Sequence, residues 1–359
     1  MYEPLRAPQA SRATPDRRAR GGRWYAVSVQ EGGPHRSMTE RGLQRREAFV
    51  TVVIPTRDRP AMLADAVASV VAQEDPPAGI LVVNDGSRRV ATDLPDGERL
   101  HVVDNRRTPG APGARNTGLA MTETPWIVFL DDDDLWDAGF LEAMTEEIRR
   151  LPETAVAVGS GFRIRTVNGT IVERIPERRE VGGEDLVVAN RLGPGSFVVC
   201  RTDAVRRVGG FDEELPGAQD WDLWLRLAGE GRIFTLNRVL GTYRVHDQDQ
   251  ISCASPSERY GKYRPFFEKR ERHPLAAGHR GELADEEYWW GVLMGWTGDD
   301  TGALHAFRHA LQLRPGHVKA RVMTMIVRSR WRPVLLRLIY GRRAERIRLE
   351  DRMEPLPRR

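Results

Sequence analysis

From Phe49 onward, the sequence alternates short runs of apolar, largely β-branched residues with stretches that have a helical period. Continuous apolar runs are typical of strands buried on both faces, and helices between them favour a parallel sheet with helices on each side. The strands expected in the first half are 50–54, 80–83, 100–103 and 126–130, and the helices are 60–73 and 112–121. We therefore expect an α/β, Rossmann-like fold with a mostly parallel central sheet and flanking helices.

Composition and charge divide the chain into three parts. Residues 1–47 are rich in Arg, Pro, Gly and Ser, which predicts a disordered, basic N-terminal segment. Residues 48–255 contain 23 Lys/Arg and 33 Asp/Glu, so this expected main domain is acidic, whereas residues 256–359 contain 22 and 13 and have a helical period. Nucleic acid is not an expected partner, because the part expected to form the sheet is acidic.

The second half of the main domain predicts strands near 155–164, 195–200 and 239–245, and a helix at about 219–229. Beyond residue 255 we expect a C-terminal α-helical extension. Several of its residues fall at the spacing of one tetratricopeptide-like helix pair, namely Gly291, Ala303, Phe307, Ala310 and Pro315. One such pair has no neighbours to stack on, so we expect it to pack on the main domain.

The end of the extension is strongly basic. Residues 326–348 contain eight Arg and one acidic residue, Glu345, around short apolar runs. A basic amphipathic helix of this kind can bind an anionic membrane surface, or its apolar side can pack on the main domain. Both interpretations stay open, and peripheral membrane contact is the one that would suit a lipid-linked acceptor.

Cysteine usage and hydropathy indicate the compartment. The chain has two cysteines, Cys200 and Cys253, far apart and without metal-ligand spacing, which favours neither a disulfide framework nor a zinc site. No apolar run approaches the roughly 18–20 residues that span a bilayer. We expect a cytoplasmic protein, either soluble or bound peripherally at the inner face of the membrane.

Polar clusters follow three of the expected strands. They are Pro55-Thr56-Arg57-Asp58-Arg59, Asn84-Asp85-Gly86-Ser87 and Asp131-Asp132-Asp133-Asp134. Ligands of open α/β sheets bind outside the carboxyl ends of the strands, so these clusters are expected to meet in one crevice. Four successive carboxylates favour a cation, and oxygen ligands suit Mg²⁺ or Mn²⁺. Taken alone, the aspartates could equally form a solvated turn that caps the next helix.

The motifs in their order resemble those of family 2 inverting glycosyltransferases, which have the GT-A fold. The resemblance covers about residues 48–250. Its motifs are Val52-Val53-Ile54-Pro55-Thr56-Arg57, Val82-Val83-Asn84-Asp85-Gly86-Ser87, Gly113-Ala114-Arg115-Asn116-Thr117-Gly118, Phe129-Leu130-Asp131-Asp132-Asp133-Asp134, Gly209-Gly210-Phe211-Asp212 and Gln219-Asp220-Trp221-Asp222-Leu223-Trp224-Leu225-Arg226-Leu227.

The resemblance implies roles for residues at the donor. Pro55, Thr56 and Arg57 would line the nucleoside pocket, Asp85 would contact the base, and Arg115 would lie near the donor. In the D-x-D motif, Asp131 would face the ribose or the metal, and Asp133 would hold the metal on the diphosphate. Asp132 is included among the donor-binding residues, because a run of four aspartates, through Asp134, allows the motif to shift by one residue.

Asp220 matches the carboxylate that acts as general base in this family. It would accept the proton of the acceptor hydroxyl as that oxygen attacks the anomeric carbon. The family usually has an acidic residue before this Asp, whereas this chain has Gln219, and we expect Asp220 to be a weaker base for that reason. On spacing alone, Asp220 could instead compensate the helix N-terminus, and Trp221, Trp224 and Leu225 have the spacing of a core face.

His246, in Tyr243-Arg244-Val245-His246, lies where several family members place a His near the diphosphate or metal. It is a candidate metal ligand, and a purely structural role is the alternative. The sequence thus predicts metal-assisted transfer of a sugar from a nucleotide-sugar donor, by default a UDP-sugar. The acceptor would be a hydroxyl on a glycan, a lipid-linked acceptor or a small molecule, as in polysaccharide biosynthesis.

Two other classes of protein were weighed. A catalytically degenerate, nucleotide-sugar-binding scaffold would have no need to retain Asp85, Asp131, Asp133 and Asp220 together. A nucleotidyltransferase should have a Gly-rich phosphate loop with a Lys after the first strand, and Pro55-Thr56-Arg57-Asp58 is not such a loop.

Overall fold

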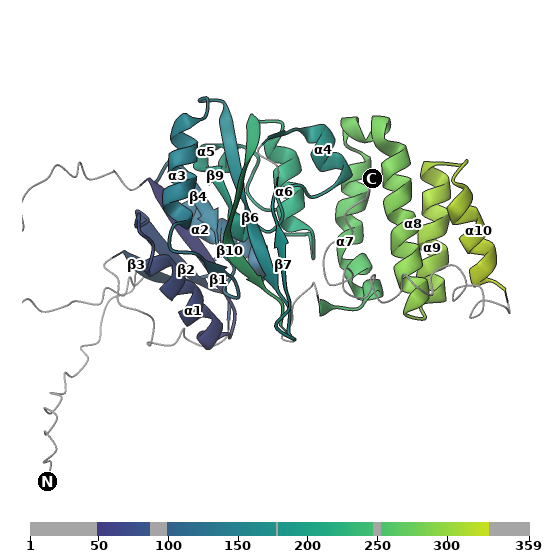
Figure 1. The fold of residues 1–359 in the computed structure, drawn as a ribbon, viewed down its shortest axis with the longest axis horizontal. Helices are drawn as coiled ribbons and strands as arrows, with labels where there is room; N and C mark the ends of the chain where they lie inside the picture. The colour runs from purple at the N-terminus through teal and green to yellow at the C-terminus, as the bar shows by residue number, and fades with distance from the viewer. Residues whose placement is uncertain (1–48, 87–98, 177–178, 247–252, 330–359) are drawn as a thin grey trace, which may run out of the picture.

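The computed structural model describes residues 49–86, 99–176, 179–246 and 253–329, and all structural statements below concern these residues. They form a mixed α/β domain followed by a group of C-terminal helices that lies beside it (Figure 1). The predicted fold class is confirmed. The predicted boundaries at 47/48 and 255/256 stay predictions, and residues 1–47 and 330–348 lie outside the described residues.

The strands form one sheet in the order β3-β2-β1-β4-β9-β6-β10-β5, with β7 paired to β6 and β8 paired to β10. The bounds are β1 Val50–Thr56, β2 Gly79–Asn84, β3 Leu100–Asp104, β4 Trp126–Phe129, β5 Leu135–Trp136, β6 Ala155–Arg165, β7 Ile171–Arg174, β8 Glu180–Val181, β9 Val198–Arg201 and β10 Arg232–Arg244. Strands β1 to β4 pair in parallel, and β9 joins them to the parallel pair β6 and β10 through antiparallel contacts.

Helices cover both faces of the sheet. Their bounds are α1 Pro60–Val71, α2 Ala111–Met121, α3 Phe140–Arg150, α4 Gly183–Val188, α5 Thr202–Arg207 and α6 Gln219–Leu227. One apolar core joins one face of the sheet to α1 and α3, and the other core joins the opposite face to α2, α4, α5 and α6. Strand β1 is buried along its whole length because it lies between these two cores.

The predicted strands at 195–200 and 239–245 differ from the structure. The first begins as a 3₁₀ turn at Gly195–Phe197 before β9, and the second is the end of the much longer β10. Strand β10 is interrupted by register shifts between Leu236 and Thr242, which break the alternation that would have revealed its full length.

The extension consists of α7 Pro256–Glu271, α8 Arg280–Trp296, α9 Asp300–Leu313 and α10 Val318–Val327. These helices share one apolar core, which also includes Leu215 and Trp221 of the α/β domain. The Trp221 ring contacts Phe266, with ring centroids 5.0 Å apart. The predicted helix pair corresponds to α8 and α9, whereas the helix that packs against α6 of the main domain is α7.

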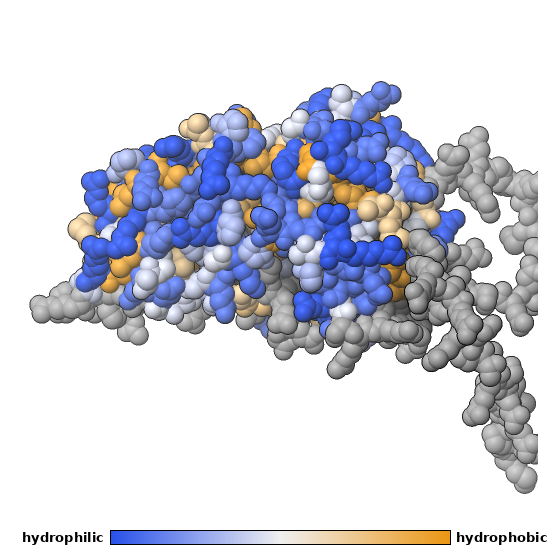
Figure 2. Space-filling model, turned by 180° about the vertical axis from the view of Figure 1, so that it is seen from behind, coloured by the Kyte–Doolittle hydropathy of each residue, from blue (hydrophilic) through white to orange (hydrophobic). Residues whose placement is uncertain are grey.

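The outer surface is mainly polar. On the face that Figure 2 shows, hydrophilic residues dominate and apolar residues form small scattered areas. Among the described residues, every helix is too short or too polar to cross a bilayer.

Candidate active site

A cleft of about 1720 Å³ opens at the carboxyl ends of β1, β2 and β4. Its lining includes most of the residues predicted for the donor and the base: Pro55, Thr56, Arg57, Asp85, Arg115, Asp131, Asp132, Asp133 and Asp220. The structure thus brings together side chains that are spread over more than 160 positions of the sequence, as the rule for open α/β sheets predicts. Asp134 and His246 do not line the cleft.

The four aspartates have different surroundings. Thr56 Oγ1 donates to Asp132 at 2.7 Å, and Arg59 Nη1 contacts both Asp132 (3.3 Å) and Asp133 (3.0 Å). Asp134 is fully buried, where it accepts hydrogen bonds from Ser196 Oγ and from the backbone N–H of Arg244. Asp134 thus serves the packing of the loop, which favours Asp131 and Asp133 as the pair that faces the cleft.

Burial and mutual repulsion make Asp131, Asp132 and Asp134 hard to ionise. Burial raises the pKa of Asp131 to about 6, against the opposing effect of Arg115. Burial also raises the pKa of Asp132, and that of Asp134 well above its usual value, with Asp133 adding to both shifts. A cation bound here would relieve both the burial cost and the repulsion.

The carboxylate oxygens of this group fit a divalent metal ion. One carboxylate oxygen each from Asp131, Asp133 and Asp134 lies within 4.8 Å of the others. Because both oxygens of Asp134 already accept hydrogen bonds, Asp131 and Asp133 are the better candidates, and one or two carboxylates are what Mg²⁺ usually takes from a protein. His246 Nε2 lies 2.9 Å from Asp133 Oδ2, so this predicted ligand is adjacent to the group although it lies outside the cleft lining.

Beyond the end of β2, Asp85 is held on both carboxylate oxygens. Asn105 Nδ2 donates to Oδ1 at 2.6 Å, and the Gly110 N–H donates to Oδ2 at 2.7 Å. Gly110 has a φ of 124°, which only glycine adopts without strain, and it is the N-cap residue that precedes helix α2. Asp85 therefore fixes the loop before α2, and each oxygen keeps a second lone pair for a ligand.

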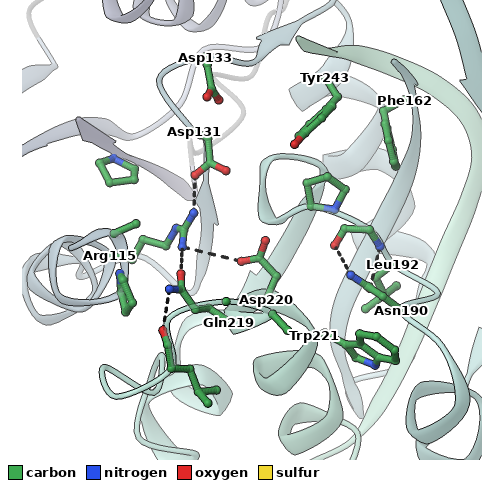
Figure 3. A pocket seen from close by; sticks show the side chains of 18 of the residues that line it. Arg115, Asp131, Asp133, Phe162, Asn190, Leu192, Gln219, Asp220, Trp221 and Tyr243 are labelled. Carbon is green, nitrogen blue, oxygen red and sulfur yellow. Dashed lines mark hydrogen bonds and ion pairs between the residues drawn. The ribbon is translucent and has the colours of Figure 1, made fainter. Parts of the chain in front are cut away.

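Arg115 lies between the aspartate group and the predicted base (Figure 3). Its Nη2 donates to Asp131 Oδ1 at 2.5 Å, and its Nη1 donates to Gln219 Oε1 at 3.1 Å and lies 4.0 Å from Asp220 Oδ1. Burial lowers the pKa of this guanidinium, but the charges of Asp131 and Asp220 raise it by more. The pKa is therefore above its usual value, and Arg115 stays charged. Arg115 was predicted near the donor, and the structure adds that it contacts Asp131 and neighbours Asp220.

Asp220 is at the N-terminus of α6 and its side chain is 21% exposed toward the cleft. The Gly195 N–H donates to Asp220 Oδ2 at 3.1 Å, which fixes the orientation of the carboxylate. The other oxygen, Oδ1, is buried and accepts no hydrogen bond from the described residues. Oδ2 retains a lone pair on the cleft side, where a hydroxyl donor could bind.

Sequence analysis missed the supporting residues of this site. Arg59 belongs to the first polar cluster but was given no role, and Ser196 and Gly195 lie in a segment predicted as a plain strand. The Asp131 N–H donates to Ser196 Oγ at 3.1 Å, so Ser196 connects Asp131 with Asp134. The pair Gly-Ser just before a strand was the one local signal that this segment is a turn.

The α/β domain that carries this cleft matches a known protein family. Residues 51–213 match the family model described as glycosyl transferase family 2, so this part of the chain is a family 2 glycosyltransferase domain. The matched segment contains Asp85, Arg115 and the four aspartates, and it ends before Asp220.

Individual relatives are more distant. The chain is 29% identical over 261 residues to the pre-mycofactocin glycosyltransferase of Mycobacterium tuberculosis, an alignment that covers 69% of this chain and 52% of that protein. It is 26% identical over 207 residues to the putative teichuronic acid biosynthesis glycosyltransferase TuaG of Bacillus subtilis, covering 55% and 79% of the two chains. The chain thus spans about half the length of the mycobacterial relative.

Two solved structures have a similar fold. Residues 1–349 of S. aureus TarS in complex with UDP-GlcNAc align with a TM-score of 0.56 and 19% identity, covering 82% of this chain and 87% of that chain. The mannosyltransferase PcManGT from Pyrobaculum calidifontis, in complex with GDP-Man and Mn²⁺, aligns with a TM-score of 0.50 and 18% identity, covering 81% and 80%.

Proposed function

We propose that this chain is an inverting glycosyltransferase that transfers a sugar from a nucleoside-diphosphate sugar to an acceptor hydroxyl, with Mg²⁺ or Mn²⁺ at Asp131 and Asp133. The observation that carries the proposal is the placement of Asp131, Arg115 and Asp220 in one cleft, with Asp131 and Arg115 inside the segment that matches the family model. UDP-GlcNAc and GDP-Man in the two similar structures support a nucleotide-sugar donor, and a UDP-sugar is the default choice.

In this mechanism the protein's own groups hold the donor and move one proton. Pro55, Thr56, Arg57 and Asp85 bind the nucleoside end of the donor, and the cation at Asp131 and Asp133 neutralises the leaving diphosphate when bound. Asp220, oriented by the Gly195 N–H, accepts the proton of the acceptor hydroxyl. In this proposal the hydroxyl that Asp220 deprotonates attacks from the side opposite the diphosphate, so the bond to the acceptor oxygen forms as the bond to the diphosphate oxygen breaks, and the anomeric configuration inverts.

The experiment is a thermal-shift and turnover screen of nucleotide sugars with and without Mn²⁺. We expect stabilisation by one nucleotide sugar and its nucleoside diphosphate in the presence of Mn²⁺. Asp133→Asn should lose the Mn²⁺-dependent part of the thermal stabilisation, because the metal loses a charged ligand. Asp220→Asn should still bind the donor but transfer sugar about 10²–10⁴-fold more slowly, the usual contribution of a general base.

Asp203→Asn is the matched control, because Asp203 lies on α5 outside the cleft and its side chain is 74% exposed. It should behave like the wild type in both measurements. If no nucleotide sugar or nucleoside diphosphate stabilises the wild type with Mn²⁺, the proposed function is wrong. Normal transfer by Asp220→Asn would refute only the assignment of the base.

A further inference from the structure

The turn between α4 and β9 contacts the predicted base. It is the 3₁₀ turn Gly195–Phe197, and its Gly195 N–H donates to Asp220 Oδ2 at 3.1 Å. Gly195 also approaches the other oxygen, because a Cβ at this position would lie 3.2 Å from Asp220 Oδ1 and 3.6 Å from the Phe129 carbonyl oxygen. A glycine here therefore lets the carboxylate lie directly against the backbone of the turn.

The next residue contacts the aspartate loop. Ser196 is fully buried, and its Oγ accepts from the Asp131 N–H at 3.1 Å and donates to Asp134 Oδ2 at 2.5 Å. Two consecutive residues of one turn therefore hold the predicted base and the loop that carries Asp131. Dashed lines in Figure 3 connect Arg115 to both Asp131 and Asp220, so a side chain and a backbone turn span the same two carboxylates.

The turn is itself anchored by buried groups on both sides. Before it, the Gly193 N–H donates to Asn190 Oδ1 at 3.0 Å, and Trp224 Nε1 donates to the Gly193 carbonyl at 3.1 Å. Trp224 belongs to α6, the helix whose first turn contains the predicted base. On the other side, Trp136 Nε1 of β5 donates to the Ser196 carbonyl at 2.7 Å. The turn is thus fixed relative to both the helix and the sheet.

The relative position of the two carboxylate sites decides the reaction geometry in the proposed function. The acceptor oxygen that Asp220 binds must lie in line with the diphosphate bound near Asp131 and Asp133. Reacting atoms have to come within about 3–3.5 Å of each other, and a misplacement of about 1 Å can lower the rate roughly 10²-fold. A rigid spacer between the two sites supplies this precision.

We propose that Gly195 and Ser196 are positioning residues that fix the distance between the base Asp220 and the metal-binding loop at Asp131. Gly195 acts on the acceptor side, and Ser196 acts on the donor side. Neither is among the described residues that line the cleft, so both act through the carboxylates that they contact. This inference rests on the proposed function, because it concerns the alignment of the two halves of the same site.

The first test is Gly195→Ala, which adds a methyl group against Asp220. Gly195 lies outside the left-handed region, so alanine fits its backbone conformation. The donor is the nucleotide sugar that the screen selects, and its nucleoside diphosphate with Mn²⁺ is the probe for binding. We expect transfer to slow about ten-fold or more, because the carboxylate has to shift by a few tenths of an ångström. Binding of the probe, measured by titration calorimetry, should be unchanged.

A double-variant cycle separates positioning from a general structural effect. In the Asp220→Asn background, Gly195→Ala should slow transfer no further, because the displaced group no longer acts as a base. The matched control is Gly261→Ala on α7, where nothing lies within 4 Å of the added methyl group, and it should behave like the wild type. Equal slowing in both backgrounds, or full activity of Gly195→Ala, would overturn the role of Gly195.

The second test is Ser196→Ala, which removes the hydroxyl between Asp131 and Asp134. Loss of a hydrogen bond that orients a metal site typically weakens metal affinity about 10–100-fold, and we expect the Mn²⁺ affinity in the presence of the nucleoside diphosphate to fall by this factor. Ser196→Cys keeps a weak hydrogen-bonding group and should lose less affinity. The control is Ser69→Ala on α1, whose hydroxyl contacts backbone groups. Equal Mn²⁺ affinity of Ser196→Ala and Ser69→Ala would overturn the role of Ser196.

The wild type keeps the failure of this inference apart from that of the proposed function. If it neither binds a nucleoside diphosphate with Mn²⁺ nor transfers sugar, the proposed function fails, and the positioning role fails with it. If the wild type binds and transfers while the variants behave like their controls, only the positioning role fails.

Discussion

Gln219 decides which charges surround Arg115. Its Oε1 accepts from Arg115 Nη1 while its Nε2 donates to the Leu215 carbonyl at 2.8 Å, so both ends of the amide are used. A glutamate at this position would add a negative charge beside Arg115 and would place a carboxylate oxygen against the Leu215 carbonyl oxygen. With glutamine, the carboxylates that raise the pKa of Arg115 are those of Asp131, Asp220 and Asp133.

Gly118 belongs to one of the motifs, and a glycine is needed there for a steric reason. A Cβ at position 118 would lie 2.3 Å from Val53 Cγ1, in the core between α2 and β1. We expect Gly118→Ala to lower the free energy of unfolding by about 1–3 kcal/mol, the usual cost of overpacking a core. Urea denaturation measures the change. Gly139→Ala, where nothing lies within 4 Å of the added methyl group, is the control and should change stability little.

At the residue scale, the sequence predicted which side chains reach the cleft better than it predicted their partners. Asp85, Asp131 and Asp220 were recognisable because each belongs to an ordered motif. The contact between Arg115 and Gln219 joins residues 104 positions apart, and no local pattern in a single sequence reveals such a pair. The roles assigned to these residues stay predictions until the variants are measured.

Among the elements, α6 depends on both neighbours for its position. Ala218 precedes it with a φ of 55°, an unusual value for a residue with a side chain, and this turn directs Gln219 and Asp220 toward the cleft. On its other side, Lys269 of α7 pairs with Asp222 at 2.7 Å. The placement of the predicted base therefore depends on the extension as well as on the sheet.

Helices α7, α8 and α9 meet at a buried charge cluster. His309 of α9 contacts Glu271 of α7 and Glu287 of α8, and these carboxylates raise its pKa from 6.5 to about 10. A raised pKa in the folded state stabilises the fold below pH 6.5, and this contribution is lost as the pH rises toward 10. After allowance for the partial exposure of His309, we expect about 1–2 kcal/mol.

The measurement is urea unfolding of the wild type and of His309→Gln at pH 6.5, 8 and 9.5. The difference between them should shrink as the pH rises. The control is His305→Gln on the same helix, because burial and Arg264 lower the pKa of His305 and its titration lies below this range. A difference for His309→Gln that stays constant with pH would contradict the assignment.

The elements that the sequence predicted well are those with a strong apolar signal. Strands β1 to β4 are predicted to within about two residues because they are short apolar runs, of which β1, β2 and β4 are largely buried. Strand β7 was missed because three of its four residues are exposed and it has no apolar period. Strands β5 and β8 have two residues each and exist only through pairing with β10, a tertiary contact.

On the scale of the whole molecule, charge is separated along the chain, with an acidic main domain and a basic C-terminal part. The predicted membrane contact of residues 326–348 remains a prediction, since most of that segment lies outside the described residues. We expect Arg342→Glu/Arg343→Glu/Arg346→Glu to weaken binding to phosphatidylglycerol vesicles at least ten-fold, because each basic residue near such a surface contributes about 1 kcal/mol.

Vesicle co-sedimentation at two salt concentrations measures this effect, and binding of the wild type should fall as salt rises. The matched control is Arg17→Glu/Arg18→Glu/Arg20→Glu, which makes the same change of charge in the N-terminal segment. If both triple variants bind alike, or if the wild type binds phosphatidylcholine vesicles equally well, the tail makes no specific membrane contact.

Trp221 contributes both to the lining of the cleft and to the packing of the extension on the main domain. One part of its ring lines the cleft next to Asp220, and another packs on Phe266 under the cation of Arg270, whose guanidinium carbon lies 4.8 Å from the ring centroid. The extension therefore cannot be exchanged independently of the α/β domain. A chimaera that exchanges α7–α10 with another protein would have to bring along the matching surface of α6, or it would disturb the wall of the cleft beside Asp220.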